Sequence, residues 1–84
     1  MIRLSDHEQI VLKLIPSNGK KITTRVLVVK FYEYLGTKVP MHGRVNVGSK
    51  IRSLIKKTRL NDVRVRSSKR AGPYPIDVWK ERRE

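Results

Sequence analysis

The number and placement of the lysine and arginine residues indicate which kind of partner this chain binds. The chain of 84 residues has 20 Lys and Arg against 7 Asp and Glu, which gives a formal net charge of +13. Residues 1–42 contribute +4 of this charge, from seven basic and three acidic side chains, and residues 43–84 contribute +9, from thirteen and four. An excess of one sign repels itself unless a polyanion offsets it, so phosphate groups are the expected partner of the second half.

Many of these cations lie in the segment Asn46–Asn61 (NVGSKIRSLIKKTRLN), which the spacing of its apolar residues predicts to be a helix. The predicted buried face consists of Val47, Ile51, Leu54, Ile55 and Thr58. The predicted outward strip consists of Asn46, Ser49, Ser53, Lys56 and Leu60, flanked by Lys50, Arg52, Lys57 and Arg59. From residue 43 to residue 61 there is no acidic residue.

Small polar side chains between basic flanks are typical of a helix that enters a nucleic-acid groove. Ser and Asn can reach base edges there, while Lys and Arg contact the phosphates of the groove walls. The alternative interpretation is an ordinary solvated charged face. The complete absence of acidic residues favours contact with nucleic acid, because solubility alone does not require it.

The helix has two possible starts, with Asn46 or Ser49 as the cap residue, and the spacing of the apolar residues favours Asn46. The preceding stretch, residues 37–45, contains Pro40 and Gly43 and is predicted to be a connection. Arg44, beside His42 in this connection, either contacts phosphate or is simply solvated.

Two short strands and a basic turn are predicted after the helix. Val63 and Val65 alternate with Arg64 and Arg66, so one strand face is expected to pack inward and the other to be cationic. The turn, residues 67–75, is predicted to carry Lys69 and Arg70 at its tip. The return strand is expected to place Ile76 and Val78 inward and Asp77 and Trp79 on the other face. Trp79 could stack on a base, although a position at the edge of the core is favoured.

The first half of the chain is predicted to supply scaffold. Ser5 and Glu8 form a capping-box pattern that begins a helix, and Pro16 ends it. Its expected buried stripe is His7, Ile10, Val11, Leu14 and Ile15. The segment Lys20–Thr23 is either a short strand or a loop. A second helix is expected from a Thr23 or Thr24 cap to Leu35, ending at Gly36. Its expected inward face is Leu27, Val28, Phe31, Tyr34 and Leu35, with Tyr32 off this face.

Catalysis, metal binding and cofactor binding are not expected. The two histidines lie 35 positions apart and there is no cysteine, so no zinc-ligand spacing is present. Ser5, Asp6 and His7 are adjacent and cannot form a triad on a helix. Gly43–Lys50 (GRVNVGSK) approaches the P-loop pattern, but Ser and Lys are transposed, which argues against nucleotide hydrolysis. No apolar run reaches membrane-spanning length, and no secretory signal is evident. A cytoplasmic, nucleoid-associated protein is therefore expected.

The predicted order of elements resembles that of winged-helix DNA-binding domains, over about residues 4–80. The resemblance implies an α+β fold for residues 1–84: a winged helix-turn-helix of three helices with a small antiparallel sheet and a C-terminal β-hairpin wing. It also implies that residues 46–60 enter the major groove as the recognition helix and that the hairpin 63–79 is the wing, with its tip at 67–75. The connection at 37–45 is longer than the tight turn between the corresponding helices in the most compact members of the family.

The function expected from these features is binding of double-stranded DNA, as a transcriptional or a replication or partition regulator. A non-specific architectural DNA-binding protein and an RNA- or ribosome-associated protein are the alternatives. A homodimer is also considered, with Val26, Val29 and Tyr32 of the second helix as one possible seam. The expected DNA contacts are Arg44, Asn46, Ser49, Lys50, Arg52, Ser53, Lys56, Lys57, Arg59, Arg64, Arg66, Lys69 and Arg70.

Overall fold

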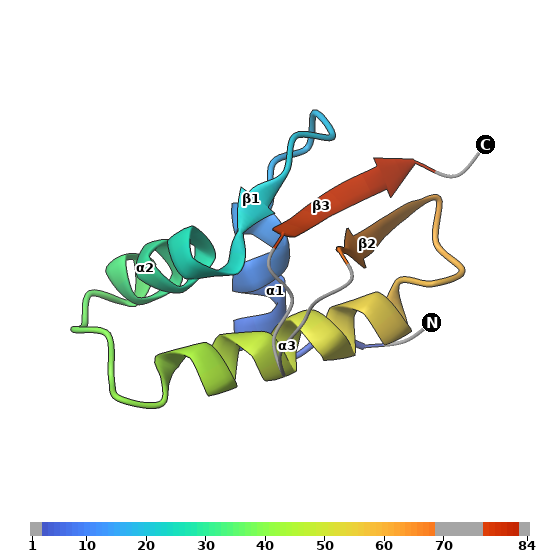
Figure 1. Cartoon of the computed structure of the whole chain (residues 1–84). Helices are drawn as coiled ribbons and strands as arrows, with labels where there is room; N and C mark the ends of the chain where they lie inside the picture. Colours follow the sequence, from blue (N-terminus) through green and yellow to red (C-terminus); the bar gives the residue numbers. More distant parts are fainter. Residues whose placement is uncertain (1–2, 69–76, 83–84) are drawn as a thin grey trace.

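The computed structural model describes residues 3–68 and 77–82, which form three helices and one three-stranded antiparallel sheet (Figure 1). The elements are α1 (Asp6–Leu14), β1 (Ile22–Thr23), α2 (Thr24–Leu35), α3 (Gly43–Lys57), β2 (Val63–Ser67) and β3 (Asp77–Arg82). The three helices all contact one another, and β2 packs on α3. The predicted α+β class, with three helices and a small antiparallel sheet, is confirmed.

The helix α1 begins as its capping box predicts. The Glu8 N–H donates to Ser5 Oγ at 3.2 Å, and the Ser5 N–H donates to Glu8 Oε1 at 2.8 Å. The helix ends at Leu14, because Ile15 takes the extended conformation that Pro16 requires of the preceding residue. His7 is exposed rather than part of the buried stripe, and its ring meets the edge of Phe31 with 5.5 Å between centroids.

The helix α2 also has the predicted ends. Thr23 Oγ1 accepts from the Val26 N–H at 3.2 Å, and Gly36 closes the helix with a φ of 74°, a conformation that glycine adopts without steric cost.

The burial of two tyrosines in α2 is the reverse of the prediction. Tyr32 is 7% exposed and Tyr34 is 54% exposed. The cause is that α2 packs against both α1 and α3, so its buried face turns toward the start of α3. There Asn46 Nδ2 donates to Tyr32 Oη at 3.2 Å. Tyr34 instead lies beneath the Lys13 ammonium group, 5.8 Å from the ring centroid.

The sheet has the strand order β1-β3-β2, with both pairs antiparallel. The segment whose structure the sequence left open forms β1, in which Ile22 pairs with Val78. Val65 and Val78 are buried as predicted, whereas Val63 is exposed because it lies at the end of β2, opposite Arg82. The predicted tip with Lys69 and Arg70, and the predicted inward position of Ile76, lie outside the described residues.

The helix α3 begins at Gly43, so both predicted starts were wrong and the connection is residues 37–42. The N-cap residue, His42, makes no side-chain capping bond. The true start of α3 therefore lacks the polar cap on which the prediction relied. Close packing explains why residue 43 is a glycine. A Cβ at Gly43 would lie 2.9 Å from Val39 Cγ1 and 3.2 Å from Tyr32 Cε2.

Buried apolar residues from all three helices and all three strands form the core. Its fully enclosed members are Val11, Ile15, Leu27, Val47, Ile51, Leu54, Val65 and Val78. The predicted buried face of α3 is confirmed at Val47, Ile51 and Leu54, and Ile55 is half-buried. Thr58 is also buried, where its hydroxyl donates to Leu54 O at 2.7 Å and accepts from the Val65 N–H at 2.9 Å. This threonine thereby joins the end of α3 to β2.

A buried carboxylate joins α1 to α3. Glu8 is only 4% exposed, and its carboxylate accepts hydrogen bonds from Lys57 Nζ at 2.8 Å and from Ser53 Oγ. Together with the Ser5 N–H, these donors lower the pKa of Glu8 from 4.5 to about 2, and the Lys57 ammonium makes the largest contribution. Hydrogen bonds to the charged form outweigh the effect of burial, which alone would raise this pKa.

Replacement of this carboxylate should therefore cost stability in a pH-dependent manner. Because the folded pKa lies below the unfolded value, the ionised carboxylate stabilises the fold above about pH 5 and loses this effect as the pH falls to about 2. We expect Glu8→Gln to lower the free energy of unfolding at pH 7 by about 2–3 kcal/mol. Urea denaturation across this pH range should show a smaller loss for the variant than for the native chain.

The exposed carboxylate of Glu33 on α2 provides a matched control. Glu33→Gln removes the same charge and should change the free energy of unfolding by less than about 0.5 kcal/mol. Equal effects of the two substitutions would contradict a stabilising role of the buried network.

Candidate nucleic-acid interface

The solvent-facing side of α3 carries polar and basic side chains spaced one turn apart. Ser49, Arg52 and Lys56 are all exposed, and spacings of three, four and seven residues place them on one face of a helix. Figure 1 shows α3 running along one side of the molecule, with the sheet above it and α1 crossing behind. These three residues define the outward face of α3, which is open to an extended partner.

Several cations around this face form no ion pair with a described carboxylate. Within residues 3–68 and 77–82, no ion pair involves Arg44, Lys56 or Arg59. Lys50 is half-buried and likewise forms none with a described carboxylate. Since α3 contains no acidic residue, the positive potential of the face is available to an external anion.

Two predicted contact residues are turned away from this face. Ser53 and Lys57 both donate to the buried carboxylate of Glu8, and Lys57 Nζ also lies 3.3 Å from the Arg3 carbonyl oxygen. Ser53 was expected to point outward beside Ser49, but it is half-buried because α1 packs on that side of α3. These two residues stabilise the fold and hold α3 in place.

Asn46 occupies an intermediate position. Its side chain is exposed, but Nδ2 donates to Tyr32 Oη at 3.2 Å. An amide carries two donor hydrogens and one carbonyl oxygen, and Oδ1 accepts no hydrogen bond from the described residues. Asn46 can therefore offer an acceptor to a ligand while its position is fixed by Tyr32.

The two arginines of β2 also differ in whether they form an ion pair within the protein. Arg64 pairs with Glu81 directly opposite in the sheet, with 2.7 Å between Nη2 and Oε1, and the hydrogen bond lowers the pKa of that carboxyl. Arg66 is exposed and lies opposite Trp79. Arg66 makes no direct ion pair with a described carboxylate, although its charge contributes to the lowered pKa of Glu81.

Trp79 is half-buried, and the Lys21 ammonium group lies 4.9 Å from the centroid of its ring. A face covered by a cation is not open to a nucleobase, so this geometry favours the predicted position at the edge of the core. Lys80, the next residue, has its pKa lowered by burial.

One basic residue was missed by the sequence analysis. Arg25 is exposed in the first turn of α2, a turn that contains no acidic residue, and it lines the same pocket as Arg44. It was overlooked because it lies in the half of the chain with the lower charge. The Thr23 cap two residues before it was the available signal, since it placed Arg25 at a helix N-terminus.

The part of the chain that the structure describes offers neither a candidate metal site nor a candidate membrane span. No group of three or more His, Asp or Glu side chains is arranged to hold a metal ion among these residues. No described helix combines the length and the hydropathy needed to cross a membrane.

Ser49 and Ser53 should respond differently to substitution, because only Ser53 contacts the buried carboxylate of Glu8. Ser53→Ala removes a hydrogen bond to a buried carboxylate and should lower the free energy of unfolding by about 1–2 kcal/mol. Ser49→Ala, on the exposed face, should change it by less than about 0.5 kcal/mol. Urea denaturation at neutral pH measures both, and equal stability of the two variants would contradict this assignment.

Comparisons with known proteins were made at three levels. No family model, no curated protein and no solved structure matches the chain. The function is therefore inferred from the geometry and charge described above.

Proposed function

We propose that this protein is a winged-helix protein that binds double-stranded DNA with α3 in the major groove. The observation that carries the proposal is the outward face of α3, where Ser49, Arg52 and Lys56 are exposed on a helix without acidic residues. A serine hydroxyl can donate to or accept from base edges, and Lys and Arg side chains pair with phosphates or with guanine.

The arrangement of elements supports this proposal. Helix, strand, helix, helix and two strands follow one another, and the sheet order is β1-β3-β2. In a winged-helix domain the third helix enters the groove and the following hairpin flanks it. Here β2 follows α3 directly along the chain and packs on it, so Arg66 on β2 is a candidate for contact with the adjacent backbone.

The dimensions of α3 are compatible with the groove. A helix of 15 residues is about 22 Å long, and the major groove of B-DNA is about 12 Å wide. Arg44 near one end of α3 and Arg59 just beyond the other are positioned for phosphates on the groove walls. In this proposal Lys57, Ser53 and Arg64 serve the fold. The cations proposed to contact the DNA are Arg44, Lys50, Arg52, Lys56, Arg59 and Arg66.

The proposed biological role is regulation of transcription, or of replication or partition, by a cytoplasmic protein that associates with the nucleoid. The dimer seam suggested on α2 is not available as expected, because Tyr32 is buried within the chain. Val26 and Val29 remain exposed on α2.

Loss of one α3 cation should weaken binding to all duplexes in a salt-dependent manner. Lys56→Ala removes one phosphate contact, so the slope of log affinity against log salt should decrease by about one. At about 0.15 M salt the affinity should fall about fivefold. Fluorescence anisotropy with a labelled random-sequence duplex between about 50 and 200 mM salt measures both quantities.

Lys30→Ala is the matched control, because it removes the same charge from an exposed position on α2. It should leave the salt slope unchanged within error. An identical slope for Lys56→Ala and the native chain would refute placement of the α3 face against DNA.

Sequence preference should depend on Ser49, the small polar residue of the outward face. Selection from a random duplex pool with the native chain should return a preferred site, and Ser49→Ala should change the preferred bases with little loss of affinity for random DNA. A pool without enriched sequences would indicate an architectural DNA-binding protein. A palindromic site would indicate a dimer, because the symmetry of the site mirrors that of the protein.

A further inference from the structure

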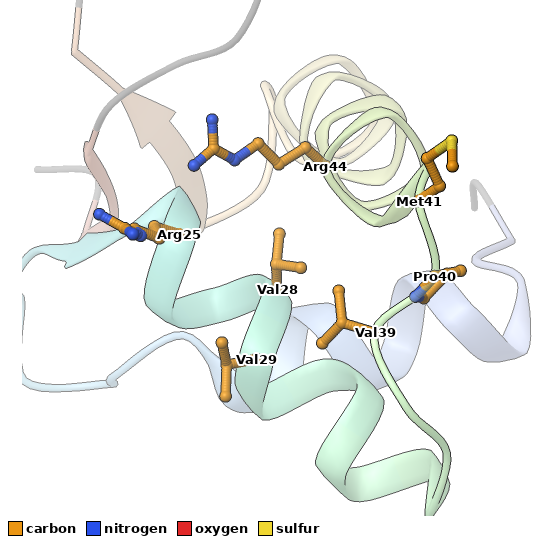
Figure 2. Close-up of a pocket in the computed structure, with 7 residues that line it drawn as sticks. All are labelled: Arg25, Val28, Val29, Val39, Pro40, Met41 and Arg44. Atoms are coloured by element: carbon orange, nitrogen blue, oxygen red, sulfur yellow. The ribbon is translucent and has the colours of Figure 1, made fainter.

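A pocket lies between α2, the connection 37–42 and the start of α3 (Figure 2). Its volume is about 410 Å³, and its apolar walls are formed by Val28, Val29, Val39, Pro40 and Met41. In Figure 2 the three valines lie at the centre of the pocket, with Pro40 and Met41 on one side. Val28 also belongs to the core, whereas Val29, Val39, Pro40 and Met41 are exposed and add apolar surface outside it.

The walls expose large apolar side chains to solvent. Val29 is 50% exposed, Val39 is 48% exposed and Met41 is 95% exposed. A group of such residues around a concavity is typical of a binding site, because removal of apolar surface from water is worth about 25 cal/mol per Å². Methionine adapts its shape to different partners and is common on surfaces that bind peptides.

Two arginines also line this apolar pocket. Arg25 comes from the first turn of α2 and Arg44 from the first turn of α3. Neither forms an ion pair with a described carboxylate, and neither first turn contains an acidic residue. A guanidinium group pairs with a carboxylate through two parallel hydrogen bonds. The complement of this surface is therefore an apolar group with carboxylates beside it.

We propose that the pocket binds an acidic and apolar peptide segment of a partner protein. A bulky apolar side chain of the segment lies between Val29, Val39 and Met41. Asp or Glu side chains next to it in the peptide pair with Arg25 and Arg44. The outward face of α3, defined by Ser49, Arg52 and Lys56, takes no part in this binding, and Arg44 is the residue that the peptide site shares with the proposed DNA contacts.

Charge argues against two other occupants. A second copy of the chain carries the same formal charge of +13 and would bring its own arginines to the contact, which is unfavourable between like charges. A DNA backbone would satisfy Arg25 and Arg44 but would leave the apolar walls against phosphates and sugars. An acidic peptide with apolar side chains satisfies both kinds of lining residue.

The test begins with a library of random short peptides displayed on phage, selected against the full chain. The enriched peptides should combine Asp or Glu with Leu, Ile, Phe or Met. One enriched peptide, made synthetically with a fluorescent label, then serves as the probe in fluorescence anisotropy. Arg25→Ser and Arg44→Ser should each weaken its binding about three- to fivefold, and Val29→Asn should weaken it about tenfold.

Three controls make the test decisive. Lys30→Ala, which removes an exposed cation of α2 outside the pocket, should leave peptide affinity unchanged. Thermal unfolding should show that each variant is folded at the assay temperature. A duplex in place of the peptide should respond to Lys56→Ala more than to Arg25→Ser.

Two outcomes would overturn the proposal. One is a selection that enriches no acidic and apolar peptide, or a peptide whose binding is indifferent to Arg25 and Val29. The other is loss of duplex binding on Arg25→Ser and Arg44→Ser equal to that on Lys56→Ala with no loss of peptide binding, which would assign both arginines to DNA. Because the peptide and the duplex are measured separately, failure of one proposal does not entail failure of the other.

Discussion

Glu8 is buried between α1 and α3, where its carboxylate accepts hydrogen bonds from Lys57, Ser53 and the Ser5 N–H. A buried carboxylate is tolerated only when such partners satisfy it, so the position of α3 relative to α1 is constrained by this one group. The same interaction fixes the rotation of α3 about its axis. The side with Ser53 and Lys57 faces α1, and the side with Ser49 and Lys56 faces solvent.

The rotation of α3 divides its cations into two functional groups. Lys57 supplies the counter-charge that keeps Glu8 ionised inside the protein. Arg44, Lys56 and Arg59 find no acidic partner among the described residues and are available to an external anion. Among the described residues, Lys57 and Arg64 are the cations that form ion pairs with carboxylates. A helix held in place on one side suits the proposed binding of a groove on the other.

Local chemistry made several elements predictable. The capping box of Ser5 and Glu8, the Thr23 cap and Gly36 at the end of α2 depend on neighbours within a few residues, and each was correctly located. The start of α3 was not, because its N-cap residue, His42, makes no side-chain capping bond that a local pattern could reveal. The burial of Tyr32 was missed for a similar reason, because it depends on how α2 meets α3.

By itself, the sequence determined the excess of positive charge, the ends of α1 and α2, and most of the apolar residues that form the core. Only the tertiary structure decided which polar and basic side chains are free. Ser49 and Ser53 have the same chemistry and lie four residues apart, yet one faces solvent and the other a buried carboxylate 45 positions away in the chain. Helical periodicity specifies which residues share a face, but the packing of α1 determines which face is covered.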